Sequence, residues 1–116
     1  MIDVADLRIF VCTTPTKMTY SFDSLMGRAQ EIFDQDPTSG HLFLFLNRRR
    51  DRIKILFWDH DGFCICYKRL EVGTFQMLTT TNDREGVEIE YWQLVKLLNG
   101  LDLNTGRRRR RYRRVS

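Results

Sequence analysis

The chain has 116 residues, of which 42% are hydrophobic, and these values predict one globular domain and exclude wholesale disorder. Its longest purely apolar run, Leu42–Leu46, is far shorter than the roughly 20 residues that cross a bilayer. The formal net charge of +4 is unevenly placed: seven arginines lie within residues 107–114, and over residues 1–106 there are 12 bases against 15 acids. We therefore expect a mildly acidic cytosolic domain over residues 1–104 and a disordered basic tail over residues 105–116.

The first third of the chain predicts a strand, a helix and a turn. Leu7–Cys12 alternates between two apolar faces, as a short strand does, and a loop over Thr13–Thr19 follows. Ser21 is a candidate helix N-cap. Apolar side chains then recur at helical spacing and predict an amphipathic helix over Phe22–Gln35, which the turn Asp36–Gly40 ends.

The middle of the chain predicts a β meander. Three strands are expected, over His41–Asn47, Arg52–Asp59 and Phe63–Leu70. The first two are joined by a short loop over Arg48–Asp51, and an Asp-Gly turn joins the last two, which is a strong hairpin signal. Both faces of these strands are apolar, so we expect helices or a partner to cover the sheet on both sides.

The last part predicts one or two further strands and a second helix. Gly73, Phe75 and Met77 indicate a short fourth strand, and Val87–Glu90 is either another strand or the lead into a helix. Helical spacing of apolar residues follows from Tyr91. The fold class is therefore predicted as α+β, an antiparallel meander of four to five strands with two packed helices and a disordered Arg-rich tail.

Two groups of basic residues are the candidate nucleic-acid contacts. Arginine offers a fixed fork of donors that matches phosphate oxygens, and a hairpin tip that carries three arginines can reach a phosphate backbone. The hairpin group consists of Arg48, Arg49, Arg50, Arg52, Lys54, Lys68 and Arg69. The tail group consists of Arg107, Arg108, Arg109, Arg110, Arg111, Arg113 and Arg114. Because Lys54 and Lys68 belong to strands expected to pair, we expect them close together.

Catalytic and metal-binding patterns are weak. Cys12, Cys64 and Cys66 are predicted as core cysteines rather than as disulfides or zinc ligands. Asp59 and Asp61 flank a turn, where aspartate is common for conformational reasons, and there is no second acidic cluster for a two-metal site. The sequence shows no Gly-rich phosphate loop and no Ser-His-Asp set, so we predict no catalysis, no cofactor and no metal.

Several blocks along residues 7–103 resemble one family. They are Pro15-Thr16 with Met18, Ser21-Phe22-Asp23 with Leu25, Pro37-Thr38-Ser39-Gly40-His41-Leu42-Phe43, Asp51-Arg52-Ile53-Lys54-Ile55-Leu56-Phe57-Trp58-Asp59, Gly62, Tyr67-Lys68-Arg69-Leu70-Glu71, Gly73 with Phe75, Gln93-Leu94, Leu97-Leu98 and Gly100-Leu101-Asp102. The chain is similar to the small accessory protein encoded by the second open reading frame of insertion-sequence-66 transposons, the TnpB-type accessory protein. The RNA-guided nucleases that share the TnpB label are unrelated.

This resemblance implies a role in DNA transposition in bacteria, beside a separate transposase that carries the catalytic acids. The family tends to have Asp-Met-Arg-Lys before the first helix, whereas this chain has Lys17-Met18-Thr19-Tyr20, so no phosphate contact is carried over to that loop. The leading hypothesis is a non-catalytic factor that binds transposon DNA, with no membrane partner and with self-association left open.

Two other functions compete with DNA binding. In the first, the protein is an adapter that docks on the transposase through apolar sheet faces, with Trp58 or Trp92 at the contact. In the second, Asp59 and Asp61 hold a divalent metal and the protein is a nuclease.

Overall fold

The computed structural model describes residues 6–76 and 84–99 of the chain. The predicted basic tail over residues 105–116 lies outside these residues, as does Met77 of the predicted fourth strand. Within the described ranges, no helix is long and apolar enough to cross a membrane.

A five-stranded sheet with the order β4-β3-β2-β1-β5 forms the centre of the fold. The strands are β1 (Ile9–Cys12), β2 (Leu42–Leu46), β3 (Arg52–Asp59), β4 (Gly62–Arg69) and β5 (Gly86–Ile89). The α+β class and the antiparallel meander β2-β3-β4 are confirmed. The sheet as a whole is mixed rather than antiparallel, because β1 pairs with β2 in parallel and with β5 in antiparallel orientation. A helical crossover between β1 and β2 allows this parallel pairing, which a tight hairpin does not.

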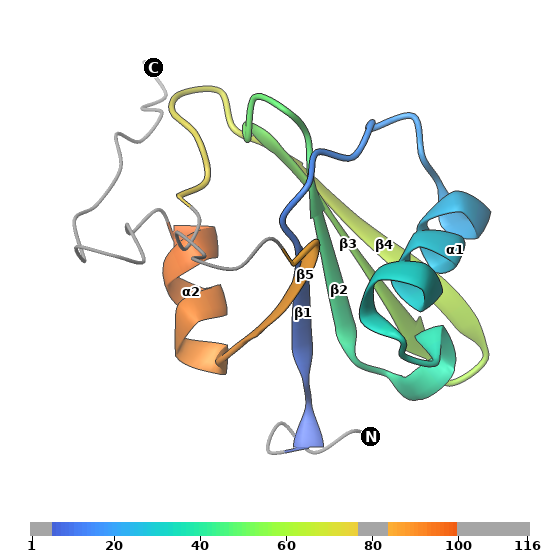
Figure 1. Cartoon of the computed structure of the whole chain (residues 1–116). Helices are drawn as coiled ribbons and strands as arrows, with labels where there is room; N and C mark the ends of the chain where they lie inside the picture. Colours follow the sequence, from blue (N-terminus) through green and yellow to red (C-terminus); the bar gives the residue numbers. More distant parts are fainter. Residues whose placement is uncertain (1–5, 77–83, 100–116) are drawn as a thin grey trace.

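Two helices lie on opposite sides of the sheet (Figure 1). Helix α1 (Phe22–Phe33) connects β1 to β2, and the Ser21 backbone N–H donates to Ser24 Oγ at its start. It ends two residues earlier than the sequence predicts because Asp34 adopts the left-handed conformation, with φ of 50°. A short 3-10 helix, η2 (Pro37–Ser39), follows it, and helix α2 (Tyr91–Asn99) follows β5.

Each helix covers its own hydrophobic core. On the α1 side, Leu25 and Ala29 pack with phenylalanines of β1 and β2, among them Phe10 and Phe43. On the α2 side, the buried residues are Ile9, Val11, Leu44, Leu46, Ile53, Phe75, Ile89, Leu94 and Leu97. Both faces of the strands are therefore apolar because the sheet is buried on both sides, as the sequence predicts.

Two further details differ from the sequence prediction. The described residues after β4 form no fourth meander strand, although Phe75 is buried there against the α2-side core. Cys12 is buried as predicted, but Cys66 is exposed and Cys64 is half-buried. The cause is that β4 is an edge strand, and its second half has no covering element in the described part of the chain.

Candidate nucleic-acid interface

The parallel pairing of β1 and β2 brings two distant loops to one end of the sheet. Because parallel strands point the same way, the loop after Cys12 and the hairpin loop after Leu46 leave the sheet at the same end. A hydrogen bond from the Thr16 backbone N–H to the Leu46 carbonyl oxygen (2.8 Å) joins them. The β1–α1 loop therefore lies beside the arginine hairpin, a contact that a purely antiparallel meander does not require.

Asn47 fixes the conformation of the hairpin loop. Its side-chain oxygen accepts hydrogen bonds from the backbone N–H groups of Asp51 (3.1 Å) and Arg52 (3.0 Å), and its amide nitrogen donates to the Asp51 carboxylate (2.6 Å). Arg50 adopts a left-handed conformation with φ of 58°, and its carbonyl accepts from the Phe75 N–H (2.6 Å). The arginines at the tip are thus carried by an ordered turn.

Arg48, Arg49 and Arg50 are exposed at this tip. Among the described residues, the ion pairs are Arg8 with Glu88 and Arg69 with Glu71, so none of the three tip guanidinium groups is paired there. Asp51, the nearest acid in the sequence, accepts a hydrogen bond from the Asn47 amide instead. The tip therefore presents three charges that are available to an anion.

Two further arginines lie beside the tip on neighbouring strands. Arg52 at the start of β3 and Arg69 at the end of β4 are direct partners in the register, and their side chains lie on the same sheet face as Tyr67. Arg52 Nη1 donates to Tyr67 Oη (3.2 Å), and Arg69 pairs with Glu71 (2.8 Å) on the surface. Surface ion pairs of this kind contribute little, so Arg69 can exchange Glu71 for another anion at small cost.

A hollow of about 570 Å³ lies between the two loops. Its lining consists of Pro15, Thr16, Lys17, Met18, Thr19, Asn47, Arg48, Arg49, Asp51 and Arg52. Four of these residues are bases and one is an acid. We define the basic edge as Lys17, Arg48, Arg49, Arg50, Arg52 and Arg69. Lys17 was missed by the sequence analysis, and the signal that could have found it is the strand-helix-strand order, which favours a parallel pair.

Lys54 lies apart from the basic edge, in the interior. Its side chain is only 8% exposed, and its Nζ donates to the carbonyl oxygens of Met18 (2.7 Å) and Tyr20 (2.6 Å). The ammonium group also lies 4.9 Å from the centre of the Tyr67 ring. In this position Lys54 tethers the β1–α1 loop to the sheet and has little surface left for a phosphate.

Lys68 lies on the other face of the sheet. It pairs in register with Ile53, one position away from the Lys54–Tyr67 pair, so its side chain points to the α2 side. Its Nζ donates to the Leu98 carbonyl oxygen (3.3 Å) near the end of α2. The expectation that Lys54 and Lys68 lie close together is therefore wrong for their side chains, although their strands do pair. The arginines of the tail group, Arg107 to Arg111, Arg113 and Arg114, lie outside the described residues.

Asp59 and Asp61, the two aspartates considered as metal ligands, lie at the opposite end of β3 from Asp51. Asp59 ends β3 and Asp61 lies in the following turn, whereas Asp51 precedes β3 at its opposite end. Asp51 and Asp59 are eight positions apart along the strand, which corresponds to about 25 Å. In the described part of the chain, no group of three or more His, Cys, Asp or Glu side chains is arranged to hold a metal ion.

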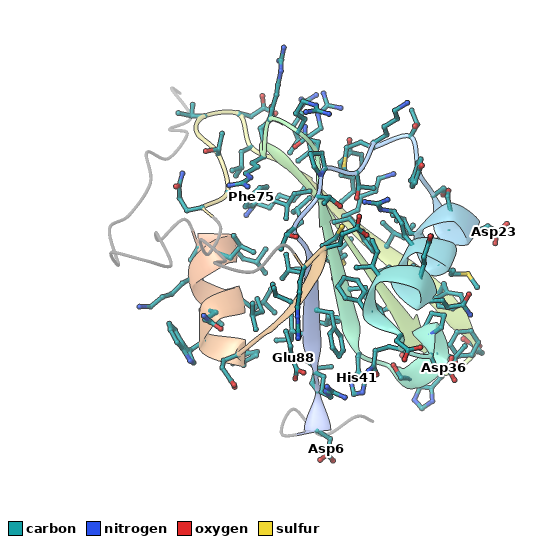
Figure 2. The ribbon with its side chains drawn as sticks, viewed as in Figure 1. Asp6, Asp23, Asp36, His41, Phe75 and Glu88 are labelled. Atoms are coloured by element: carbon teal, nitrogen blue, oxygen red, sulfur yellow. The ribbon has the colours of Figure 1, made fainter. Side chains whose placement is uncertain are left out.

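The end of the sheet opposite the basic edge carries a separate polar cluster, where His41 and Glu88 lie far from Phe75 (Figure 2). Arg8 donates to the Glu88 carboxylate (2.7 Å), and this hydrogen bond lowers the pKa of Glu88 and raises the pKa of Arg8. The Arg8 backbone N–H donates to His41 Nδ1 (3.0 Å). Burial, and then the charge of Arg8, lower the pKa of His41.

We expect the free energy of unfolding to decrease when the pH is lowered from about 7.5 to about 5.5, because unfolded His41 binds a proton more readily than folded His41. Protonation of Nδ1 also removes the acceptor for the Arg8 N–H. Urea unfolding at each pH measures this dependence. The dependence of the free energy of unfolding on pH should weaken in His41→Gln and persist in His60→Asn. An unchanged pH dependence in His41→Gln would contradict the assignment of this effect to His41.

Comparison with known proteins identifies relatives over most of the chain. An uncharacterized protein, y4hO, from Sinorhizobium fredii is 33% identical over 97 residues, which cover 84% of this chain and 83% of the relative. A second uncharacterized protein of that organism, y4jC, is 33% identical over 69 residues, or 60% of this chain and 59% of the relative. No solved structure gives a significant match.

The sequence model of one protein family also matches this chain. That family is described as IS66 Orf2 like protein, and the match extends over residues 7–108, which includes both loops of the basic edge and all five strands. The resemblance found from the sequence blocks is thereby confirmed. The chain belongs to the IS66 Orf2-like family, and this membership implies an accessory role in the transposition of insertion sequences of that class.

Proposed function

We propose that this accessory protein binds DNA of its insertion sequence through the basic edge and makes no covalent change to it. The transposase of the same element would carry out the chemistry, and both proteins would act in the cytoplasm. The tail arginines would add further phosphate contacts during the encounter. Self-association with a second copy of the chain stays a prediction. Lys54 and Lys68 are not included in the proposed surface, because one is buried and the other lies on the far face.

The observation that carries this proposal is the ordered, unpaired arginine tip. Within residues 6–76 and 84–99, Arg48, Arg49 and Arg50 have no acidic partner, although acids outnumber bases over residues 1–106. Arg50 adopts the left-handed backbone conformation, which glycine adopts at the lowest energetic cost. The turn itself therefore does not explain a long cationic side chain at this position. Such side chains are suited to bidentate contacts with phosphate oxygens.

The test is a salt titration of duplex binding with the full chain. The double variant Arg48→Ala/Arg49→Ala should bind a transposon-end duplex more weakly, and the slope of log K against log salt should become shallower by about 1.8, or 0.9 for each lost phosphate contact. The matched control, Lys68→Ala/Lys96→Ala, removes the same formal charge from the α2 side and should leave the slope unchanged.

The adapter function is the second candidate, and one observation favours it. Tyr91, Trp92 and Val95 are exposed together on α2, with Trp92 52% accessible. Aromatic side chains of this kind are enriched in protein interfaces. If Arg48→Ala/Arg49→Ala leaves both the affinity and the salt slope at their original values, the basic edge does not bind duplex DNA, and docking on the transposase becomes the better explanation.

A further inference from the structure

An aromatic side chain lies exposed beside the bases of the proposed surface. Tyr67 on β4 is 50% exposed, and in the register its strand neighbour Arg69 pairs with Arg52. We propose that Tyr67 is a stacking platform for an unpaired DNA base, so that the basic edge holds a single-stranded segment as well as a duplex. This inference rests on the DNA-binding function proposed above and specifies which form of DNA the surface accepts.

The ring of Tyr67 is held in place from two directions. Lys54 Nζ lies 4.9 Å from the ring centre on its inner face, and Arg52 Nη1 donates to the hydroxyl (3.2 Å). Lys54 is in turn fixed by the Met18 and Tyr20 carbonyl groups. A ring that is already ordered loses little conformational freedom when a ligand stacks on it.

The outer face of the ring is available to a ligand. Over residues 6–76 and 84–99, Tyr67 lies on the edge strand β4 with no further strand beside it, and Lys54 Nζ lies over the inner face of the ring. The contact with Lys54 accounts for the inner face of the Tyr67 ring. It does not explain why half of the tyrosine is accessible to solvent. Every nucleobase has a π-face, and stacking on aromatic side chains is how proteins hold single strands without sequence preference.

The charges beside the ring match the backbone of such a strand. Arg52 and Arg69 belong to one cross-strand pair, whose Cβ atoms lie about 5 Å apart, next to the ring on the same sheet face. A base stacked on Tyr67 would therefore have guanidinium groups within reach of its flanking phosphates. In an intact duplex the faces of internal bases are covered by their neighbours, so stacking on Tyr67 requires an unpaired base.

The test compares a short oligothymidylate with a duplex of the same length, by fluorescence anisotropy of the labelled DNA with the full chain. In Tyr67→Leu, which keeps an apolar cover over Lys54, affinity for the single strand should fall by about 5-fold to 150-fold, the range that corresponds to stacking of one base. Affinity for the duplex should change less than twofold. Tyr67→Phe should retain single-strand binding, and the exposed control Tyr91→Leu should behave as the original protein.

Three results would overturn the stacking inference: no loss of single-strand affinity in Tyr67→Leu, an equal loss on single strand and duplex, or a loss in Tyr67→Phe as large as in Tyr67→Leu. Thermal melting of each variant separates these results from unfolding, and Tyr67→His supplies a second planar ring if the leucine variant is unstable. Failure of the proposed function is distinguishable, since it appears as unchanged duplex binding in Arg48→Ala/Arg49→Ala whatever the Tyr67 variants do.

Discussion

Alanine in place of Phe43 is expected to lower the free energy of unfolding by about 3–5 kcal/mol. The side chain is 0% exposed at the centre of the α1-side core. Its ring stacks on Phe10 with centroids 5.6 Å apart, and it lies 5.6 Å from the ring of Phe33 in α1. Truncation therefore removes a large buried apolar surface and leaves a cavity where β1, β2 and α1 meet.

The measurement is urea unfolding followed by the circular dichroism of the backbone. Phe22→Ala is the matched control, because Phe22 begins α1 but is 44% exposed. Phe22→Ala should lower the free energy of unfolding by no more than about 1 kcal/mol, as an ordinary surface substitution does. Equal losses in the two variants would show that α1 does not pack on the sheet through Phe43.

Much of the fold follows from local patterns in the sequence. Period-two alternation and the Asp-Gly turn place β3 and β4 to within one residue, because strand faces and a tight turn are both encoded in neighbouring residues. The spacing of apolar residues from Phe22 likewise predicts α1. Its end is less predictable, since Asp34 stops the helix through a left-handed conformation that aspartate tolerates but does not require.

Pairing between distant segments is less accessible from sequence. The direction of β1 relative to β2 depends on the path of the intervening helix, and no residue within either strand encodes it. This direction decides which loops lie at the same end of the sheet. The run of bases in the sequence therefore points to Arg48, Arg49 and Arg50 but not to Lys17, which lies in the neighbouring loop. The sequence thus predicts the hairpin part of the candidate site but misses Lys17 in the β1–α1 loop.

Alternation along a strand also decides which bases can act together. Lys54 and Lys68 look equivalent in sequence, as two lysines on adjacent strands. The register places them on opposite faces, and the β1–α1 loop then covers Lys54. A shift of one position in the pairing reverses the face of every side chain, so the grouping of charges is sensitive to a detail that composition does not contain.

Methionine in place of Lys54 is expected to lower the free energy of unfolding by about 1–3 kcal/mol. Methionine has a similar length and preserves the packing, but it leaves the Met18 and Tyr20 carbonyl oxygens without their donor. Replacing a buried ion pair by apolar residues can be neutral, but Lys54 is bonded to backbone acceptors that remain after the substitution. Urea unfolding measures the loss.

DNA binding separates this structural role from a phosphate contact. If Lys54 only tethers the β1–α1 loop, Lys54→Met should weaken DNA binding without changing the salt slope, since no phosphate contact is lost. Lys17→Met is the matched control and should show the reverse: nearly unchanged stability, because Lys17 is exposed, and a slope shallower by about 0.9. A shallower slope in Lys54→Met would mean that the ammonium group leaves its two carbonyl partners when DNA binds. The basic edge would then include a lysine that the free protein keeps buried.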